Sequence, residues 1–269
     1  MQIVFVGGGN MATALIGGML HQGFHARDIS VVEPDAGRRE TLHRDFGVAV
    51  HADTPPAPRF DVVVLAVKPQ QMKQVARHWA DAAAGALVIS IAAGIRTESL
   101  SGWLGGLQRL IRVMPNTPAL VQAGVSGLYA GPAVNQQDRD TAQRILAAVG
   151  DVVWVSSEPM IDAITAISGS GPAYVFYFIE SLTEAAQALG FAPEQARQLA
   201  YGTFAGAIKL ARQSEDDAAT LRANVTSKGG TTEQALSAME ADGVKAAILA
   251  AAQAACRRGK ELGDEFGNQ

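Results

Sequence analysis

The stretch that decides the fold is residues 2–12, which read Q-I-V-F-V-G-G-G-N-M-A. Its apolar run Ile3–Val6 is typical of a buried parallel strand, and a helical pattern follows over residues 11–20. Between the two lies Gly7-x-Gly9-x-x-Ala12, the spacing of a dinucleotide-binding turn. In such a turn the first glycine permits the bend, the second lets the backbone approach a pyrophosphate, and the small third residue lets the helix pack on the strand.

The surroundings of this motif strengthen the prediction. A glycine-rich hairpin or linker can produce the same letters by chance. Here a strand precedes the glycines, a helix follows them, and an acidic residue, Glu33, ends the next apolar run, residues 29–32. The order therefore predicts a site where the pyrophosphate binds the free N–H groups at the start of a helix.

Glu33 bears on which dinucleotide binds. A carboxylate at the end of the second strand accepts hydrogen bonds from the ribose hydroxyls of NAD and repels the extra phosphate of NADP. Arg38 and Arg39 follow closely and offer charge that offsets this repulsion. The alternative is that Glu33 is a solvated strand-end charge and the arginines a solvated helix face. The sequence thus leaves both NADPH and NADH open as the cofactor.

Composition excludes several classes of function. The 269 residues are 48% hydrophobic, which allows one or two domains with a good core. The net charge of -4 gives no electrostatic footprint for nucleic acid or for an anionic membrane. The single cysteine, Cys256, excludes an internal disulfide framework and fits a reducing compartment. We expect no export signal, because the chain begins directly with a strand, and no membrane-spanning segment.

Residues 1–157 alternate between predicted strands and helices, with strands at 3–6, 29–32, 48–50, 62–67, 87–91, 110–114, 125–129 and 152–155. Helices are predicted between several of them, including 35–46 and 136–149, the latter with Asn135 as its N-cap. This pattern predicts an α/β fold with a Rossmann-like, mainly parallel sheet covered on both faces. Loops of small residues and prolines at 66–69, 92–94 and 115–118 fall at one edge of that sheet with the glycine turn, which favours a cofactor groove there.

Residues 158–269 read as helices only. Helices are predicted behind Pro172 up to Gly190, and at 193–213, 217–224, 232–241 and 244–262, with Gly243 and Gly263 as stops and a frayed tail at 264–269. Their broad apolar faces indicate burial against a second copy of the chain. We therefore expect an all-helical C-terminal domain that forms a homodimer.

The most informative stretch of this half is S-K-G-G-T-T-E-Q at residues 227–234. Thr231 followed by Gln234 predicts a capping box and hence the start of a helix. Two glycines before a helix start expose N–H donors toward one point, where the helix dipole favours an anion such as a carboxylate. Thr232 places a hydroxyl near the same point. The alternative is a capped helix after a flexible loop, with nothing bound.

The five histidines all precede the helical half, and none is spaced with cysteine or carboxylates as a metal site requires. A histidine-based alcohol oxidation is therefore not expected, and neither is a metal. Reduction of a protonated C=N bond needs no strong protein acid. A side-chain hydroxyl and a set of N–H donors that bind the substrate carboxylate suffice for it.

Six motifs occur together and in order: V-G-G-G-N-M-A at 6–12, A-V-K-P at 66–69, S-I-A-A-G at 90–94, R-V-M-P-N-T-P-A at 112–119, S-G-S-G-P-A-Y at 168–174 and G-G-T-T at 229–232. Through them the chain resembles the pyrroline-5-carboxylate reductase family over essentially its full length. The resemblance implies a cytoplasmic enzyme that reduces 1-pyrroline-5-carboxylate to proline, the last step of proline biosynthesis, with NADPH or NADH. It also implies a dimer through the helical domains, assembled into decamers in some members.

The resemblance also implies site residues. Cofactor contacts fall on Val6, Gly7, Gly8, Gly9, Asn10, Met11, Glu33, Pro34, Ala66, Val67, Lys68, Pro69, Ile91, Ala92 and Ala93. Substrate contacts fall on Glu158, Asn224, Gly230, Thr231, Thr232 and Glu233, and the Thr232 hydroxyl is the group that meets the imine nitrogen.

Two positions depart from the family pattern. Many members carry a small polar or basic pair where this chain has Glu33-Pro34, which leaves the family preference for NADPH open here. Lys228 stands where the family often has proline, and either adds charge near the substrate carboxylate or points to solvent. Two other functions stay open on the residues alone: a hydroxyacid dehydrogenase, for which Lys209 is the candidate catalytic lysine, and a dinucleotide-binding sensor without turnover.

Overall fold

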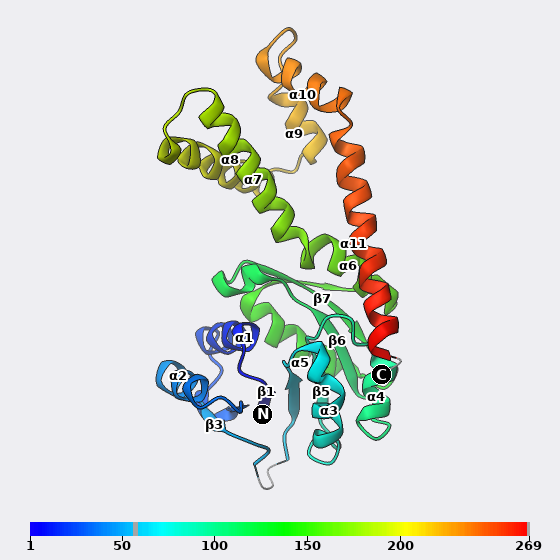
Figure 1. Cartoon of the computed structure of the whole chain (residues 1–269). Coiled ribbons are helices and arrows are strands. Elements are labelled where there is room, and N and C mark those ends of the chain that lie inside the picture. The colour runs from blue at the N-terminus through cyan, green and yellow to red at the C-terminus, as the bar shows by residue number, and fades with distance from the viewer. Residues whose placement is uncertain (56–58, 268–269) are drawn as a thin grey trace. The chain divides into compact units, whose positions relative to one another are not determined.

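The computed structural model describes residues 1–55 and 59–267, and the N-terminal part of the chain is built on one twisted sheet (Figure 1). The strands run in the order β3-β2-β1-β4-β5-β6-β7-β8. Their bounds are β1 Ile3–Val6, β2 Ile29–Val32, β3 Ala49–His51, β4 Val62–Leu65, β5 Leu87–Ser90, β6 Leu110–Met114, β7 Gly124–Ala130 and β8 Gly150–Trp154. The chain reverses its direction of growth between β1 and β4, the switch point of a doubly wound sheet. The predicted α/β fold is confirmed.

One strand pair is antiparallel. β7 runs antiparallel to β6, whereas every other pair in the sheet is parallel. The connection between them, residues 115–123, contains only the 3-10 helix Thr117–Val121. A parallel crossover requires about a dozen residues or more, so this short connection forces the chain to turn back.

Helices cover both faces of the sheet, as the apolar strands predict (Figure 1). β1 alternates between two cores. Ile3 and Phe5 face the core formed with α1 (Asn10–His21), α2 (Ala36–Phe46) and α5 (Gln136–Leu146). Val4 and Val6 face the core formed with α3 (Pro69–Trp79) and α4 (Thr97–Trp103). Burial on both faces is why the strand sequence is apolar at every position.

The predicted cap of α5 is confirmed. Asn135 accepts a hydrogen bond from the Asp138 backbone N–H, and the Asp138 carboxylate accepts one from the Asn135 N–H, which completes a capping box. The helix predicted to reach residue 149 ends at Leu146 and continues as the 3-10 helix Ala147–Val149.

After β8 the chain forms α6 (Pro159–Ile164) and then the π-helix Thr165–Gly169. The Asn116 side chain holds this segment to the sheet, because its amide nitrogen donates to the Ser168 carbonyl at 3.0 Å and its amide oxygen accepts from the Val125 N–H. Residues 159–169 therefore pack with the sheet although their sequence pattern is helical.

The chain divides into two compact units, Met1–Ser170 with Ala254–Gln269, and Gly171–Gln253. This division differs from the expected boundary between residues 157 and 158, because α6 and the end of α11 pack with the sheet unit. The second unit holds α7 (Gly171–Ala188), α8 (Pro193–Gln213), α9 (Ala218–Asn224), α10 (Thr231–Ala241) and the first part of α11 (Val244–Gly267), up to Gln253. Within it α7 and α8 pack together, and large apolar side chains are exposed, among them Phe176, Tyr177, Leu189, Tyr201, Ile208 and Leu249.

The predicted end of the last helix is wrong. α11 does not stop at Gly263 but runs to Gly267, and the tail is not frayed at residues 264–267. Phe266 is 9% exposed and packs in the core next to Gly94. A side chain at Gly263 would meet the Arg96 guanidinium at about 3.1 Å, so this glycine makes room for a contact and does not end the helix.

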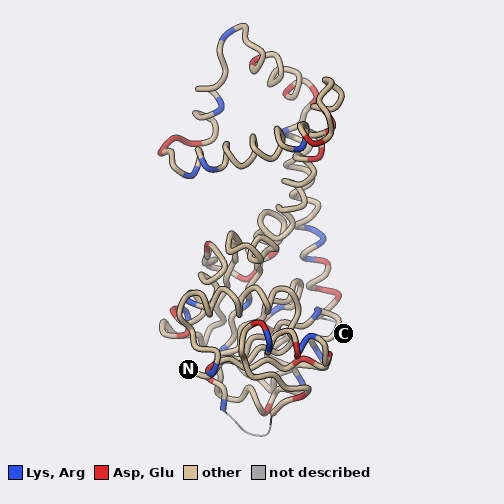
Figure 2. Tube along the Cα trace, turned by 90° about the vertical axis from the view of Figure 1, so that its left-hand side faces the viewer, with Lys and Arg blue, Asp and Glu red and all other residues tan. Residues whose placement is uncertain are grey.

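Charges are mixed in sign throughout the described chain, as Figure 2 shows. No helix in the described part of the chain combines the length and the apolar character that crossing a bilayer requires.

Candidate functional site

Backbone hydrogen bonds hold three predicted site loops side by side at the carboxyl ends of the strands. The Gly7 N–H donates to the Val32 carbonyl, and the Ala66 N–H donates to the Val6 carbonyl, both at 2.8 Å. The Ile91 N–H donates to the Leu65 carbonyl at 3.1 Å. The glycine turn, the loop after β4 and the loop after β5 therefore lie in sequence along one edge of the sheet.

A cleft of about 890 Å³ opens at this edge, within the size range of small-molecule sites. Its lining includes the predicted cofactor residues Val6, Gly7, Gly9, Glu33, Pro34, Ala66, Val67 and Lys68. The remaining predicted residues, Gly8, Asn10, Met11, Pro69, Ile91, Ala92 and Ala93, lie in the same loops or helix starts but do not line the cleft. The structure thus gathers the predicted cofactor residues at one edge of one sheet.

The three glycines of the turn are required for different reasons. Gly7 has φ +102°, which disfavours any side chain, and a Cβ there would lie 2.7 Å from the Ala66 oxygen. A Cβ at Gly8 would lie 2.6 Å from Leu42 Cδ1. A Cβ at Gly9 would meet no protein atom within 4 Å, and its φ of -72° suits any residue. Protein packing therefore does not explain Gly9, whereas close approach of a phosphate does.

The start of α1 provides the donors for such a phosphate. Gly9 occupies the N-cap position, and no side chain caps the helix. The first-turn N–H groups thus lack the usual side-chain acceptor, and they form the positive end of the helix dipole. Residues 7–12 therefore fit the pyrophosphate of a dinucleotide, which requires N–H donors and no obstructing side chain.

Glu33 is buried, so the alternative of a solvated strand-end charge is wrong. Glu33 is 8% exposed, and both of its carboxylate oxygens accept hydrogen bonds from backbone N–H groups. One accepts from the Gly8 N–H at 2.9 Å and the other from the Asp35 N–H at 3.0 Å. The Arg39 guanidinium donates to the carbonyls of Glu33 and Pro34 at 2.7 and 2.6 Å. Glu33 and Arg39 thus fix the shape of the loops at this end of the cleft.

Several lining residues were not predicted. Ala52 and Asp53 follow β3, while Gln71, Gln74, Val75, His78 and Trp79 come from α3. The carboxyl end of β3 faces the same edge as those of β1 and β2, so strand order could have identified Asp53. The Thr54 N–H and, next, His78 Nε2 at 2.9 Å lower the pKa of the Asp53 carboxyl. The polar residues on α3 carry no comparable signal in the sequence.

The start of α10, in the second unit, is the other predicted site. The helix begins at Thr231, one residue before the predicted start at Thr232, and the predicted capping box is wrong: Gly230 is the N-cap, and no side chain caps it. Glu233 and not Gln234 reaches back, and its carboxylate accepts from the Gly229 N–H at 2.6 Å. Gly229 has φ +76°, which allows the tight approach to the helix. The N–H groups of the first turn therefore remain without a side-chain acceptor.

The Thr232 hydroxyl makes no hydrogen bond within the described residues. Other helical threonines, such as Thr183 and Thr203, donate to the carbonyl four residues earlier at 2.7 Å. Thr232 lies in the first turn, where no helical carbonyl stands behind it. Its half-buried hydroxyl is therefore available to a ligand at the same helix end.

Asn224, a predicted substrate residue, and Lys228 and Lys209, the two lysines whose roles the sequence leaves open, are all exposed. Asn224 ends α9 and makes an amide contact of 3.5 Å with Asp216, both in the exposed part of the second unit. Lys228 is exposed in the loop before Gly229, and Lys209 is exposed on α8. None of these three is held in a buried network.

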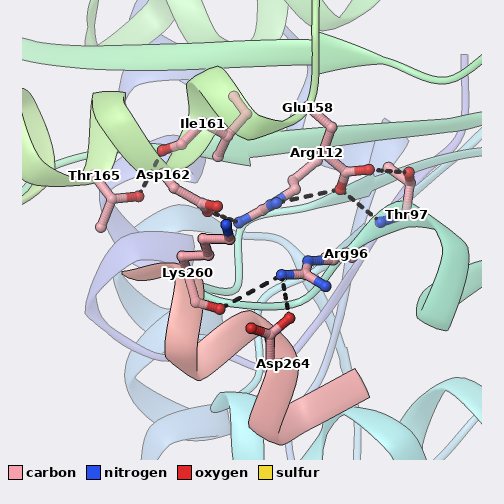
Figure 3. A network of polar contacts seen from close by, with 9 residues as sticks. All are labelled: Arg96, Thr97, Arg112, Glu158, Ile161, Asp162, Thr165, Lys260 and Asp264. Atoms are coloured by element: carbon pink, nitrogen blue, oxygen red, sulfur yellow. Dashed lines mark hydrogen bonds and ion pairs between the residues drawn. The ribbon is translucent and has the colours of Figure 1, made fainter. Parts of the chain in front are cut away.

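Glu158 is held in a polar network of the sheet unit (Figure 3). One carboxylate oxygen accepts from the Thr97 N–H at 2.7 Å and from Arg112 Nη1 at 3.2 Å, and the other accepts from the Thr97 hydroxyl at 2.6 Å. Arg112 Nη2 donates to Asp162 Oδ1 at 2.9 Å, and the adjacent Arg96 pairs with Asp264 at 2.7 Å. The observed role of Glu158 is thus to fasten the start of α6 to the sheet, and the substrate contact implied for it stays a prediction.

Within residues 1–55 and 59–267, no three His, Cys, Asp or Glu side chains are grouped so that they could hold a metal ion.

Sequence models of two families match the chain. The first, described as pyrroline-5-carboxylate reductase dimerisation, matches residues 158–262. The second, described as NADP oxidoreductase coenzyme F420-dependent, matches residues 2–94. The first match begins at residue 158, the second ends at residue 94, and the residues between are matched by neither.

Whole-chain relatives agree. The chain is 43% identical to a pyrroline-5-carboxylate reductase of Pseudomonas aeruginosa over 99% of this chain and 98% of that protein. Among solved structures, a pyrroline-5-carboxylate reductase from Coxiella burnetii matches with a TM-score of 0.93 and 42% identity, covering 97% of this chain and 98% of that one. A Plasmodium falciparum pyrroline carboxylate reductase with NADP bound matches with a TM-score of 0.86 and 29% identity, covering 98% of each chain.

Proposed function

The chain belongs to the pyrroline-5-carboxylate reductase family, and from that premise we propose that it reduces the C=N bond of 1-pyrroline-5-carboxylate to give L-proline, with NADPH or NADH as hydride donor. The observation that carries this proposal is the pairing of two features in one chain. One is a dinucleotide cleft with an open helix start at Gly9, and the other is an uncapped helix start with a free hydroxyl at Thr232.

The cofactor residues of the proposal are those of the sheet edge. We assign the N–H groups at the start of α1 to the pyrophosphate, and Ala66 to Pro69 and Ile91 to Ala93, which lie at the same edge of the sheet, to the nicotinamide half of the cofactor. When bound, the reduced nicotinamide supplies the hydride for the reaction. The protein contributes binding and orientation.

The substrate residues of the proposal are those of the α10 start. The N–H groups of Thr231, Thr232 and Glu233, with Gly230 at the cap, bind the substrate carboxylate. The Thr232 hydroxyl contacts the ring nitrogen and orients the C=N bond, and Asn224 lies at the end of the preceding helix. The nitrogen of a protonated imine already carries the proton that the product amine needs, so the hydride alone completes the reduction and no protein acid is required.

The proposal also covers the domains of the chain, its oligomeric state and its cellular compartment. Residues 1–157 form the cofactor domain and residues 158–269 the substrate and dimerisation domain, which the match of the dimerisation family model supports. The exposed apolar side chains of α7 and α8 support a homodimer through the helical domain. Light scattering after gel filtration tests this and separates a dimer from a decamer. We place the enzyme in the cytoplasm, for which the single cysteine is the supporting feature.

A direct assay tests the activity. We expect the purified protein to oxidise NADPH or NADH, followed by the loss of absorbance of the reduced nicotinamide, when 1-pyrroline-5-carboxylate is added, and to form proline in equal amount. A folded protein that binds a cofactor but oxidises neither one with this substrate would overturn the proposal.

A further inference from the structure

Two charged residues at the β2 end of the cleft differ sharply in how they are held. Glu33 is 8% exposed, and each of its carboxylate oxygens accepts a backbone N–H. Arg38 also lines the cleft but is exposed, and within the described residues its guanidinium makes no hydrogen bond or ion pair. The Glu33 carboxylate is thus bound by protein donors, whereas the Arg38 guanidinium is available to a ligand.

The partners of Glu33 belong to the two loops that shape the cleft. Gly8 lies in the glycine-rich turn, and Asp35 is the N-cap of α2, where its own carboxylate accepts from the Arg38 N–H at 2.8 Å. Glu33 thus ties the turn after β1 to the start of the helix after β2. Each carboxylate oxygen of Glu33 already accepts one protein N–H, so fewer of its acceptor positions remain for ribose hydroxyls, although Glu33 still lines the cleft.

The two arginines that follow Glu33 in sequence have separate roles. Arg39 donates to the carbonyls of Glu33 and Pro34 and so stabilises the loop from its other side. Arg38 leaves its guanidinium, a planar fork of donors suited to phosphate, beside the end of the cleft where the second strand stops.

None of the acidic groups around Arg38 is seen to pair with its guanidinium within the described residues. The Asp35 carboxylate caps the helix, and the Asp53 carboxylate is bonded to the Thr54 N–H and to His78 Nε2. Lys68 adds a further positive charge to the lining. The acidic groups at this end are therefore occupied by protein donors, whereas a basic group is free.

We propose that Glu33 is a positioning residue that fixes the glycine-rich turn, and that Arg38 is the specificity-determining residue, which binds the 2′-phosphate of NADPH. This inference rests on the proposed function and deepens it, because it assigns the cofactor choice that the sequence leaves open. A glutamate at the end of β2 then no longer excludes NADPH.

The test measures binding of NADPH and of NADH separately, without substrate, by the fluorescence of the reduced nicotinamide. We expect Arg38→Ala to raise the Kd for NADPH about tenfold, the usual effect of removing one charge-assisted hydrogen bond, and to leave the Kd for NADH within about twofold. Arg44→Ala is the matched control, because Arg44 lies on the same helix but pairs with Asp45 outside the cleft. It should change neither Kd.

Glu33→Gln separates positioning from selection. Its amide group cannot accept from both N–H groups, so we expect the affinities for NADPH and NADH to fall in parallel and their ratio to stay constant. The proposal is overturned if Arg38→Ala leaves NADPH binding unchanged, or if Glu33→Gln selectively strengthens NADPH over NADH. Failure of the proposed reaction would be seen separately, as wild-type protein that binds a cofactor without turning over the substrate.

Discussion

The guanidinium of Arg112 in β6 lies 3.2 Å from the carboxylate of Glu158, the residue that precedes α6 (Figure 3). The Arg112 side chain is 3% exposed and also donates to Asp162, so one buried cation holds two carboxylates from the same helical segment. A buried charge depends strongly on its partners, because removing one leaves the other without compensation.

We therefore expect Glu158→Ala to lower the free energy of unfolding by about 3 kcal/mol, the usual cost of breaking a buried ion pair. Urea unfolding followed by circular dichroism measures this. Glu261→Ala is the control, since Glu261 pairs with Arg258 on the exposed face of α11 and should matter by less than about 1 kcal/mol. Unchanged stability combined with a raised KM for the substrate would instead support the substrate contact that the family resemblance implies for Glu158.

Two adjacent glycines should respond in opposite ways to the same substitution. A Cβ at Gly9 meets no protein atom within 4 Å, whereas a Cβ at Gly8 lies 2.6 Å from Leu42 Cδ1. Gly9→Ala should preserve stability to within about 1 kcal/mol but weaken cofactor binding by about 1–3 kcal/mol, because the methyl group meets the pyrophosphate. Gly8→Ala should lower the stability of the free protein.

Thermal unfolding and cofactor titration of both variants distinguish these effects. If Gly9→Ala bound the cofactor with wild-type affinity, the phosphate would not lie at the start of α1.

Thr232→Ala should lower kcat by about 10- to 100-fold, or roughly 1–3 kcal/mol, with little change in cofactor affinity. The reason is that its hydroxyl, free of protein partners, is the group we assign to the ring nitrogen. Thr203→Ala is the matched control, because that hydroxyl already donates to the Leu199 carbonyl within α8. Equal kinetics for Thr232→Ala and the wild type would contradict the assignment.

Acid should weaken the pairing of Arg109 with Asp138. The Arg109 side chain holds the pKa of the buried Asp138 carboxyl below its ordinary value, chiefly by hydrogen bonding, and Arg109 Nε lies 2.9 Å away. A depressed folded-state pKa stabilises the protein above the unfolded pKa of about 3.9, and that stability is lost as the pH falls through the folded value.

The expected result for Asp138→Asn is lower stability at neutral pH and a shallower loss of stability below about pH 4. Chemical unfolding at a series of pH values measures both. A variant that kept the wild-type slope in acid would show that this carboxyl does not contribute to the acid sensitivity.

The sequence was most informative where one strand or turn determines its own structure. The run Ile3–Val6 is apolar because both faces of β1 are buried, and the spacing of Gly7 and Gly9 follows from the turn itself. The free hydroxyl of Thr232 likewise follows from its place in the first turn of α10. These features depend on neighbours along the chain, so the sequence pattern predicts them.

Features that depend on distant contacts were missed. The carboxylate of Glu33 faces Gly8 and not solvent, which no local pattern indicates. The helix start was predicted at residue 232 with Thr231 as its cap, but the cap lies one residue earlier, at Gly230, and Glu233 rather than Gln234 reaches back, to Gly229. The cleft-lining residues from α3 share only helical spacing, which is equally typical of a solvated helix face.

The end of α11 is a further case, and it can be tested. Phe266 keeps the helix ordered past Gly263 because its ring packs against Gly94 in the loop after β5. Phe266→Ala should lower the free energy of unfolding by about 3 kcal/mol through the cavity it leaves. Glu265→Ala, on the exposed side of the same turn, should change it by less than about 1 kcal/mol. If both variants were as stable as the wild type in urea unfolding, residues 264–267 would contribute nothing to the core. That result would agree with the frayed tail that the sequence predicted.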